Sequence, residues 1–585
     1  MINNRTYEGP KTSISMELDE MKYRQEGESF DDKVKRLANA LCDGEDHRLE
    51  LEEIFGLMRF LPAGRVQNAM GSRRITTAYN CFVSGIIDDN MKSIMKRAAE
   101  AAETMRRGGG VGYDFSRIRP KGAHIVTLDS KASGPVSFMS IFDAVCQTIA
   151  SSGHRRGAQM GVLRVDHPDI KDFITAKRNS DKLTGFNISV GITDKFMEAL
   201  MNPEDDGFDL VFEDVVYDRV SATELWDMIM ESTWDWAEPG VLFIDRLNEM
   251  NNLHYCEVLE ATNPCGEQPL PPQGACLLGS FNLTKYTHED ENGHFYFDFN
   301  QFKEDIPHVV RAMDNVIDRT IYPLKEQQDE AKNKRRMGLG VTGLANAGEL
   351  IGYPYGSEEF LKWAEKVFAC LRDNTYLTSA LLAKEKGTFP LYRPEYLKSN
   401  FIRTLPASVK KEIREYGIRN SHLTSIAPTG TISLVADNVS GGIEPVFSHY
   451  YDRTIQTFDG ARVERVEDYA YARGVAGRTS SEISVQDHLA VLLLAQHYVD
   501  SACSKTCNVG DEVSYEEFKQ VYVDAWKGGA KGCTTFRVSG KRFGIFNETV
   551  EEEEKVSSTN EEMAQEEGTV EACFIDPATG QKECS

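Results

Sequence analysis

Short strand-like runs alternate with helix-like segments through residues 170–260, and this alternation limits the possible folds more than any other feature. The runs FNISVGIT, GFDLVFE and GVLFID are rich in β-branched and aromatic residues, and helical patterns separate them. Strands that alternate with helices in this way are typical of α/β proteins. The chain has 585 residues and 41% hydrophobic composition, which is enough for a large core. We therefore predict an α/β fold.

The segment Asn263-Pro264-Cys265-Gly266-Glu267 places an amide, a thiol and a carboxylate at alternate positions. In an extended segment such side chains share one face. Pro264 disfavours helix at Asn263, and Gly266 permits a tight turn, so extended or loop geometry is expected. Cys276 follows in GACLLGSFNL. Two interpretations stay open from this stretch alone: a turn with a buried thiol, or a reactive centre where three groups converge.

Charge and hydropathy exclude several classes of function. The net charge of −25 argues against a broad nucleic-acid-binding surface. The first residues lack the apolar core of a signal peptide, and no apolar run approaches the 18 or so residues of a membrane span. A cytoplasmic protein without membrane or nucleic-acid partners is expected. In a reducing compartment, the twelve cysteines favour catalytic, redox or metal-binding roles over structural disulfides.

Three glycine-containing segments are candidates for binding phosphate groups. In the segment 426–433, small hydroxyl residues surround a glycine, and a helix starting there would direct backbone N–H groups at an anion. An ordinary capped helix start is the alternative. The cluster Gly108–Gly112 follows a helix rather than a strand, so a flexible loop or helix end competes with phosphate binding. The basic loop His154–Met160 suits phosphate or base recognition, or is a solvated charge pair.

Both ends of the chain differ in composition from the middle. Residues 1–60 carry two amphipathic helical patterns and are predicted to form a small helical region, closed by a turn at Phe60–Arg65. Residues 61–546 form the main body. Acidic residues dominate from Glu548 to Glu571, which predicts a disordered linker within a tail spanning 547–585. Cys573 and Cys584 lie beyond that linker. They suit disulfide exchange with a distant site, because no second cysteine pair exists to complete a zinc site, and no metal is predicted.

Taken together, the motifs resemble those of the large catalytic subunit of ribonucleotide reductase, most closely the adenosylcobalamin-dependent type, class II. They occur in the expected order: LPAGR, YNCFV, RRGGGVGYDFSRIRP, HRRGAQMGVLRVDHPDI, NPCGEQPL, ACLLGSFNL, RRMGLGVTGLA and APTGTISL. The resemblance covers roughly residues 60–545 and the cysteine tail. It implies a ten-stranded α/β barrel with NPCGE on a finger loop through its centre.

The resemblance also implies the chemistry. Cys265 would become a thiyl radical that takes the 3′ hydrogen of a ribonucleotide, Glu267 would act as base on the 3′ hydroxyl, and Asn263 would hold the sugar. Cys81 and Cys276 would supply the two electrons and end as a disulfide. Cys573 and Cys584 would reduce that disulfide and be recycled by a thioredoxin-like partner. The substrate phosphates, of a diphosphate more than a triphosphate, would bind Thr429, Gly430, Thr431, Ile432 and Ser433.

The resemblance also implies how the protein is regulated and how it assembles. A deoxynucleotide effector that adjusts substrate choice would bind the segments Gly108–Arg119 and His154–Met160, across a homodimer interface. The candidate effector residues are Asp88, Asp89, Arg119, Arg155, Arg156 and Gln159, and Ser133 is a further candidate for substrate binding. The usual N-terminal ATP-cone has no room before LPAGR, so no overall shut-off by dATP is expected.

The radical source follows from residues 531–537, which read KGCTTFR. Class I subunits carry adjacent tyrosines there, which receive a radical from a second subunit. Class III enzymes carry a glycyl-radical motif, but Lys541 replaces its aromatic residue, and their zinc-binding cysteine cluster is absent from this sequence. Both departures favour adenosylcobalamin as cofactor. The alternatives are a class I subunit that needs a separate radical-generating subunit, and a non-catalytic nucleotide-binding barrel.

Overall fold

The structure is a computed structural model that describes residues 7–151, 155–156, 158–178, 182–457, 460–537, 574–575 and 582–583. The acidic linker and both tail cysteines, Cys573 and Cys584, lie outside these residues, as does His154.

The centre of the molecule is an eight-stranded mixed sheet of order β15-β2-β3-β8-β9-β12-β23-β22. Strands β2, β3, β8, β9 and β12 pair with one another in parallel, and the connections between them carry helices. The pairs β15–β2 and β12–β23 are antiparallel. The α/β prediction is therefore confirmed. The strands are β2 (Cys81–Val83), β3 (Gly110–Asp114), β8 (Gln159–Arg164), β9 (Phe186–Ile192), β12 (Gly240–Phe243), β15 (Ala275–Cys276), β22 (Thr506–Val509) and β23 (Gly532–Arg537).

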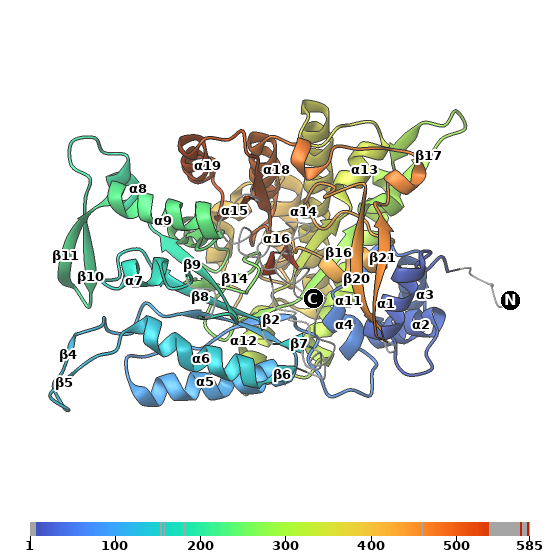
Figure 1. The fold of residues 1–585 in the computed structure, drawn as a ribbon. Coiled ribbons are helices and arrows are strands. Elements are labelled where there is room, and N and C mark those ends of the chain that lie inside the picture. The colour runs from blue at the N-terminus through green and yellow to red at the C-terminus, as the bar shows by residue number, and fades with distance from the viewer. Residues whose placement is uncertain are drawn as a thin grey trace.

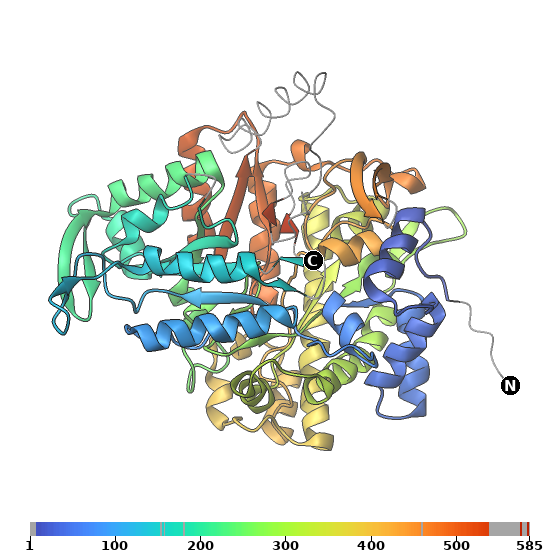
Figure 2. The same cartoon turned by 60° about the horizontal axis from the view of Figure 1, so that its bottom comes forward.

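Helices cover one face of this sheet, which we call the outer face (Figures 1 and 2). They are α5 (Met91–Arg106), α6 (Pro135–Thr148), α9 (Ala222–Trp236), α18 (Val485–Tyr498) and α19 (Tyr515–Lys527). Val111 and Tyr113 of β3, and Cys507 and Val509 of β22, pack in the same core cluster as these helices. Side chains alternate along a strand. The intervening residues of β3 and β22 therefore point to the opposite, inner face.

A second sheet of three strands joins β1 (Phe60–Pro62), β16 (Leu278–Asn282) and β19 (Gly338–Thr342). Only Leu277 separates β16 from β15 of the large sheet. On the other side, the segment 424–426 bridges both sheets, because Thr424 pairs with Leu339 of β19 and Ile426 pairs with Cys503, three residues before β22. Helices α11 (Phe299–Arg319), α14 (Glu358–Lys386) and α16 (Ala407–Tyr416) pack around this half.

Residues 7–60 contain three helices, α1 (Ser13–Tyr23), α2 (Phe30–Leu41) and α3 (Glu45–Gly56). Ser29 and Asp32 form a capping box at the start of α2. The turn expected at residues 60–65 is instead strand β1 followed by helix α4 (Gly64–Ala69), because Phe60 pairs with Phe281 across the second sheet. This pairing partner is more than 200 residues away, so local turn signals did not reveal it.

Several hairpins project from the body. The pairs β4 (His124–Ile125) with β5 (Ser130–Lys131), and β10 (Gly207–Phe212) with β11 (Val215–Ser221), lie at the end opposite α1–α3 (Figure 1). The other paired strands are β6 (Ala150–Ser151) with β7 (Arg155–Arg156), β13 (Ala261–Thr262) with β14 (Pro269–Leu270), β17 (Thr287–Glu289) with β18 (Phe295–Phe297), β20 (Tyr450–Thr457) with β21 (Gly460–Glu467), and β24 (Phe574–Ile575) with β25 (Lys582–Glu583). The remaining helices are α7 (Ile170–Ile174), α8 (Asp194–Leu200), α10 (Ile244–Glu249), α12 (Lys325–Lys334), α13 (Leu344–Leu350), α15 (Asn400–Arg403) and α17 (Gly430–Val435), with 3-10 turns at 283–286, 394–398, 471–473 and 480–482.

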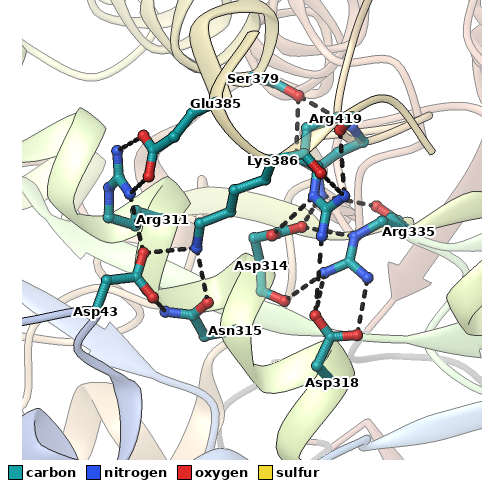
Figure 3. Close-up of polar contacts among 12 residues, drawn as sticks. Asp43, Arg311, Asp314, Asn315, Asp318, Arg335, Ser379, Glu385, Lys386 and Arg419 are labelled. Carbon is teal, nitrogen blue, oxygen red and sulfur yellow. Dashed lines mark hydrogen bonds and ion pairs between the residues drawn. The ribbon is translucent and has the colours of Figure 1, made fainter. Parts of the chain in front are cut away.

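A buried ion network fixes α11 to the C-terminal end of α12 and to the loop after α16 (Figure 3). The Asp314 carboxylate accepts hydrogen bonds from Arg335 Nε at 2.9 Å and Arg419 Nε at 3.1 Å. Arg335 also binds Asp318 through both terminal nitrogens, at 2.9 and 2.8 Å. The Asp314 side chain is completely buried. Such paired, hydrogen-bonded charges hold three distant segments in one arrangement.

Candidate active site

The segment 263–267 forms the tip of the hairpin between β13 and β14. Gly266 N donates to Asn263 O at 3.1 Å, and Gly266 has a φ of 85°, which favours glycine. The expected loop geometry is therefore present, in the form of a tight turn rather than an extended run. Asn263, Cys265 and Glu267 are 0%, 3% and 1% exposed. A turn tip that is this deeply buried differs from ordinary surface loops.

This hairpin, which we call the finger hairpin, lies against the inner face of the large sheet. A side chain on Gly112 of β3 would come within 1.9 Å of Thr262 O, so only glycine leaves room for β13 there. Asn187 Nδ2 of β9 donates to Pro264 O at 3.2 Å. Cys265 packs against Ala158, the residue before β8. The glycines of β3 thus admit the hairpin, and β8 and β9 hold its tip.

Two further cysteines lie beside the hairpin. Cys276 of β15 pairs directly with Cys81 of β2 across the antiparallel register. A Cβ on Gly110 would stand 3.2 Å from Cys81 Sγ and 3.1 Å from the Pro264 ring, so Cys81 adjoins the finger tip. Burial raises the pKa of Cys276 well above its usual range, and the nearby Glu267 and Cys81 add to the shift. The structure thus gathers Cys81, Cys276, Glu267 and the tip in one buried place.

Cys265 itself is disulfide-bonded in the structure. No disulfide joins Cys81 to Cys276. Chemistry on the Cys265 sulfur therefore requires reduction to the thiol first. Among the described residues, no group of three or more His, Cys, Asp or Glu side chains is arranged to hold a metal ion.

Two buried polar atoms at the ends of the finger tip have no hydrogen-bond partner among the described residues. Asn263 Oδ1 accepts from Gln268 N at 3.0 Å, while its Nδ2 has no partner among the described residues. Gln268 Nε2 donates to Ser425 Oγ at 2.8 Å, and its Oε1 likewise has none. Both side chains are completely buried. A buried donor and a buried acceptor without partners each need an explanation, and a bound polar ligand would supply one. Gln268 belongs to the NPCGEQPL motif, but the motif alone does not indicate a role for it.

The predicted phosphate loop, residues 428–433, begins helix α17. Thr429 adopts a left-handed conformation with φ 57°, and its Oγ1 accepts from Gly442 N at 2.7 Å and contacts Thr342 Oγ1 at 2.9 Å. Ser433 Oγ donates back to Thr429 O at 2.8 Å. Gly430 and Thr431 are partly exposed at the helix start, whereas Thr429, Ile432 and Ser433 are buried. Strand β25 of the C-terminal hairpin lies beside α17.

The phosphate loop and the finger hairpin share a connection. The segment 424–426 runs directly into the loop, and its Ser425 is the residue that binds Gln268. Ala502 N, next to this segment, donates to Glu267 O at 2.9 Å. The structure therefore brings the finger residues and the phosphate loop into one continuous region.

The candidate effector residues lie elsewhere on the sheet. Asp89 accepts from Arg119 N at 3.1 Å and forms an ion pair with its side chain, and Asp88 is hydrogen-bonded to Ser93 at the start of α5. Gln159 is buried and accepts from Tyr113 OH at 2.9 Å. Arg155 and Arg156 form β7, which pairs with β6.

Ser133 is exposed, and its carbonyl accepts from Ser137 at 3.0 Å. Its described contacts are local, and none joins it to the residues around Cys265.

The glycine cluster serves more than one purpose. Gly108 has a φ of 94° and follows the end of α5, in line with the expected helix end. Gly110 and Gly112 belong to β3, which was not expected from a cluster of glycines. Their lack of side chains is explained by the finger hairpin, which occupies the space.

Fold and site together define an α/β protein in which buried cysteines and a carboxylate gather beside the predicted phosphate loop. The family model for the ribonucleotide reductase barrel domain matches residues 79–474 and 462–536. The chain belongs to the ribonucleotide reductase family.

Individual relatives agree with this assignment. The chain is 36% identical over 498 residues to the vitamin B12-dependent ribonucleoside-diphosphate reductase of Mycobacterium tuberculosis (strain CDC 1551 / Oshkosh), covering 79% of this chain and 68% of that protein. It is 33% identical to the protein of the same name from Thermoplasma acidophilum, covering 86% of this chain and 67% of the relative. The ribonucleoside-diphosphate reductase subunit alpha of Chlamydia pneumoniae is 27% identical over 70% of this chain and 44% of its own length. The chain thus spans about two thirds of the first two relatives.

Proposed function

We propose that this chain is a cobalamin-dependent ribonucleotide reductase that converts ribonucleoside diphosphates to 2′-deoxyribonucleotides for DNA synthesis. The observation that carries the proposal is the meeting of Cys265, Glu267, Cys81 and Cys276 in one buried place beside the phosphate loop. The names of the Mycobacterium and Thermoplasma relatives favour the diphosphate substrate and the cofactor.

Each group has a role that its position supports. Cys265, as a thiyl radical, takes the 3′ hydrogen atom of the ribose, and Glu267 accepts the proton of the 3′ hydroxyl. Asn263 Nδ2, which has no partner among the described residues, donates to the sugar. The 2′ hydroxyl then leaves as water. Cys81 and Cys276 supply two electrons and two protons and become a disulfide.

The buried setting suits radical chemistry. Cys265 is only 3% exposed, so the protein excludes most solvent from the reactive sulfur. Thr429–Ser433 would hold the substrate diphosphate through backbone N–H groups at the partly exposed start of α17. The Ser425–Gln268 hydrogen bond fixes the distance between the phosphate loop and the finger hairpin.

The finer architecture in this proposal is a closed ten-stranded barrel around the finger hairpin. It is supported by the bridges at Thr424 and Ile426, which join the two sheets on one side, and by the continuity of β15 with β16 on the other. Counted around this ring, the strands are β15–β16, β2, β3, β8, β9, β12, β23, β22, the segment 424–426 and β19.

The residues around Cys265 fit a bound cofactor. An added side chain on Gly266 would meet nothing within 4 Å, so open space adjoins the sulfur-bearing residue. The inner face of β23 offers Gly532, Thr534 and Phe536, none of which carries a tyrosine hydroxyl for radical transfer. Cys265 and Gly266 would face adenosylcobalamin, which supplies, when bound, the radical equivalent that oxidises the Cys265 thiol.

The remaining partners belong to the same proposal. Asp88, Asp89, Arg119 and the segment 155–159 would bind a deoxynucleotide effector at a homodimer interface, with Ser133 as a weaker substrate contact. The tail cysteines Cys573 and Cys584 would reduce the Cys81–Cys276 disulfide and be recycled by a thioredoxin-like protein. The place of β25 beside α17 supports a tail that reaches this site. The helices of the described segments are too short or too polar to cross a bilayer, and a cytoplasmic location is part of the proposal.

One assay tests the proposal. The purified, reduced protein is given adenosylcobalamin, dithiothreitol, a ribonucleoside diphosphate and a deoxynucleotide effector, without a second subunit. We expect deoxynucleotide formation, and none with Cys265→Ser. Complete inactivity of the wild-type protein under these conditions would refute the proposal. Changing Cys573 and Cys584 to Ser should spare turnover with dithiothreitol and impair turnover with thioredoxin.

A further inference from the structure

Strand β22 carries two polar side chains on the inner face, outside the motifs that the chain shares with its family. Thr506 and Asn508 alternate with Cys507 and Val509, which pack on the outer helices. Thr506 Oγ1 and Asn508 Oδ1 are buried, and neither has a hydrogen-bond partner among the described residues. Thr506 is only 1% exposed. Leaving such atoms without hydrogen bonds costs free energy. A bound group that forms hydrogen bonds with them would remove this cost.

The chain around β22 runs from the finger hairpin to the phosphate loop. At its start, Ala502 N donates to Glu267 O at 2.9 Å, and Cys503 pairs with Ile426 in parallel. The two segments run in parallel. Thr506 and Asn508, which follow Cys503, therefore lie on the same side of this pair as the phosphate loop, which follows Ile426. Their side chains therefore face the span between the ribose site and the diphosphate site.

A buried ion pair fixes this segment to the turn behind the phosphate loop. Glu444 Oε1 accepts from Thr506 N at 2.6 Å, and Glu444 Oε2 binds Lys505 Nζ at 2.7 Å. Glu444 N donates to Gly441 O at 2.8 Å, in the same turn whose Gly442 N binds Thr429 Oγ1.

The Lys505 ammonium is held on its remaining sides as well. It donates to His488 Nδ1 at 2.9 Å and to Thr506 O at 2.8 Å. Burial and the Lys505 charge lower the pKa of His488 well below its usual range, so His488 is neutral and accepts. Both backbone groups of Thr506 are thereby fixed, and its side chain can only point inward. This degree of preorganisation is typical of ligand-contacting residues.

We propose that Thr506 and Asn508 contact the bound ribonucleotide between its ribose and its diphosphate. The Thr506 hydroxyl donates to an oxygen of the 5′ side of the nucleotide, and Asn508 Oδ1 accepts from a ribose hydroxyl. This inference rests on the proposed function and adds two specific substrate contacts to it.

The test replaces each polar group by an apolar one of similar size. Thr506→Val and Asn508→Leu should each raise KM for the ribonucleoside diphosphate about tenfold, with a change in kcat of about threefold or less. The matched control is Thr535→Val on the neighbouring strand β23. Thr535 is also buried but faces outward, where its hydroxyl contacts Tyr522 OH at 2.8 Å. The control should lower the unfolding temperature and leave KM unchanged.

Equilibrium binding of a ribonucleoside diphosphate by calorimetry separates failure of this inference from failure of the proposed function. If wild-type protein binds no diphosphate at all, the proposed function fails. If wild-type and Thr506→Val proteins bind it equally, and KM is also unchanged in both β22 variants, the inference is overturned. A tenfold weaker binding constant in Thr506→Val, with the Thr535→Val constant unaltered, supports it.

Discussion

Cys276 lies directly opposite Cys81, because β15 and β2 pair in antiparallel register at these two residues. Directly opposed residues bring their Cβ atoms to about 4.5–5.5 Å, close to the separation that a disulfide needs. Under the proposed function, reduced enzyme without added reductant should convert substrate in a short burst. Peptide mapping by mass spectrometry should then find a new Cys81–Cys276 disulfide.

The Cys81→Ser and Cys276→Ser variants should each fail to form deoxynucleotide in this burst. Cys256, which is exposed, provides the control, since Cys256→Ser should behave like wild type. A full burst from Cys276→Ser would show that the electrons come from elsewhere.

Glycine at position 112 is predicted to be essential for placing the finger hairpin. A methyl group there would stand 1.9 Å from Thr262 O, so the backbone leading to Asn263 and Cys265 must shift. We expect Gly112→Ala to lose about 1–3 kcal/mol of stability and to lower kcat more than about tenfold, because small displacements of reacting groups are costly. Denaturant unfolding and steady-state kinetics measure the two effects.

Gly44→Ala is the matched control, since an added methyl group at Gly44 meets nothing within 4 Å. Its kcat should equal that of wild type. If Gly112→Ala also keeps full activity, the hairpin does not depend on the close approach at β3.

The two halves of the site differ in how far the sequence could predict them. Cys81, Cys265 and Cys276 occur in distinctive local motifs, and the α/β alternation is likewise a local pattern. Both could therefore be predicted from the sequence. The role of Gly112 could not be predicted from the sequence, because it depends on Thr262, which approaches Gly112 only in the folded chain.

The same limitation applies to β22. Whether Thr506 points inward or outward is decided by pairing with β23 and by Glu444, more than 60 residues away. An alternating pattern of two polar residues in KTCNV gives no indication of which face they occupy. The orientation of Thr506 therefore depends on contacts with residues far away in the chain, and the sequence alone does not show these contacts.

The ion network of Figure 3 predicts a large loss of stability when Asp314 is removed. Asp314→Ala leaves the Arg335 and Arg419 guanidiniums without their shared carboxylate, in a buried place. Breaking a buried ion pair by removing one partner costs about 3–5 kcal/mol. Urea unfolding should show this as a lower midpoint.

Glu385→Ala tests the same network at its exposed edge. Glu385 pairs with Arg311 at 2.6 Å, but its side chain is 52% exposed, and exposed pairs contribute about 0–1 kcal/mol. Equal losses in Asp314→Ala and Glu385→Ala would contradict the view that burial decides the effect.

The carboxyl group of Glu349, on α13, predicts how stability depends on pH. Burial raises the pKa of Glu349 to about 8; the backbone N–H of Arg478 opposes this shift, and nearby Asp468 adds to it. The unfolded chain loses this proton near the ordinary pKa of 4.5. Between these values the folded state binds more protons than the unfolded state, so stability must fall as pH rises from about 4.5 to 8.

The Glu349→Gln variant removes this titration while keeping a side chain of similar shape. The difference in unfolding free energy between variant and wild type should therefore grow with pH, by at most about 1.4 kcal/mol per unit, and level off above pH 8. Urea unfolding between pH 5.5 and 8.5 measures it. Glu358→Gln, an exposed change on α14, should give a difference that does not vary over this range, because an exposed carboxyl is ionised throughout it in both states. A constant difference for Glu349→Gln as well would mean that the Glu349 carboxyl is already ionised in the folded protein at pH 5.5.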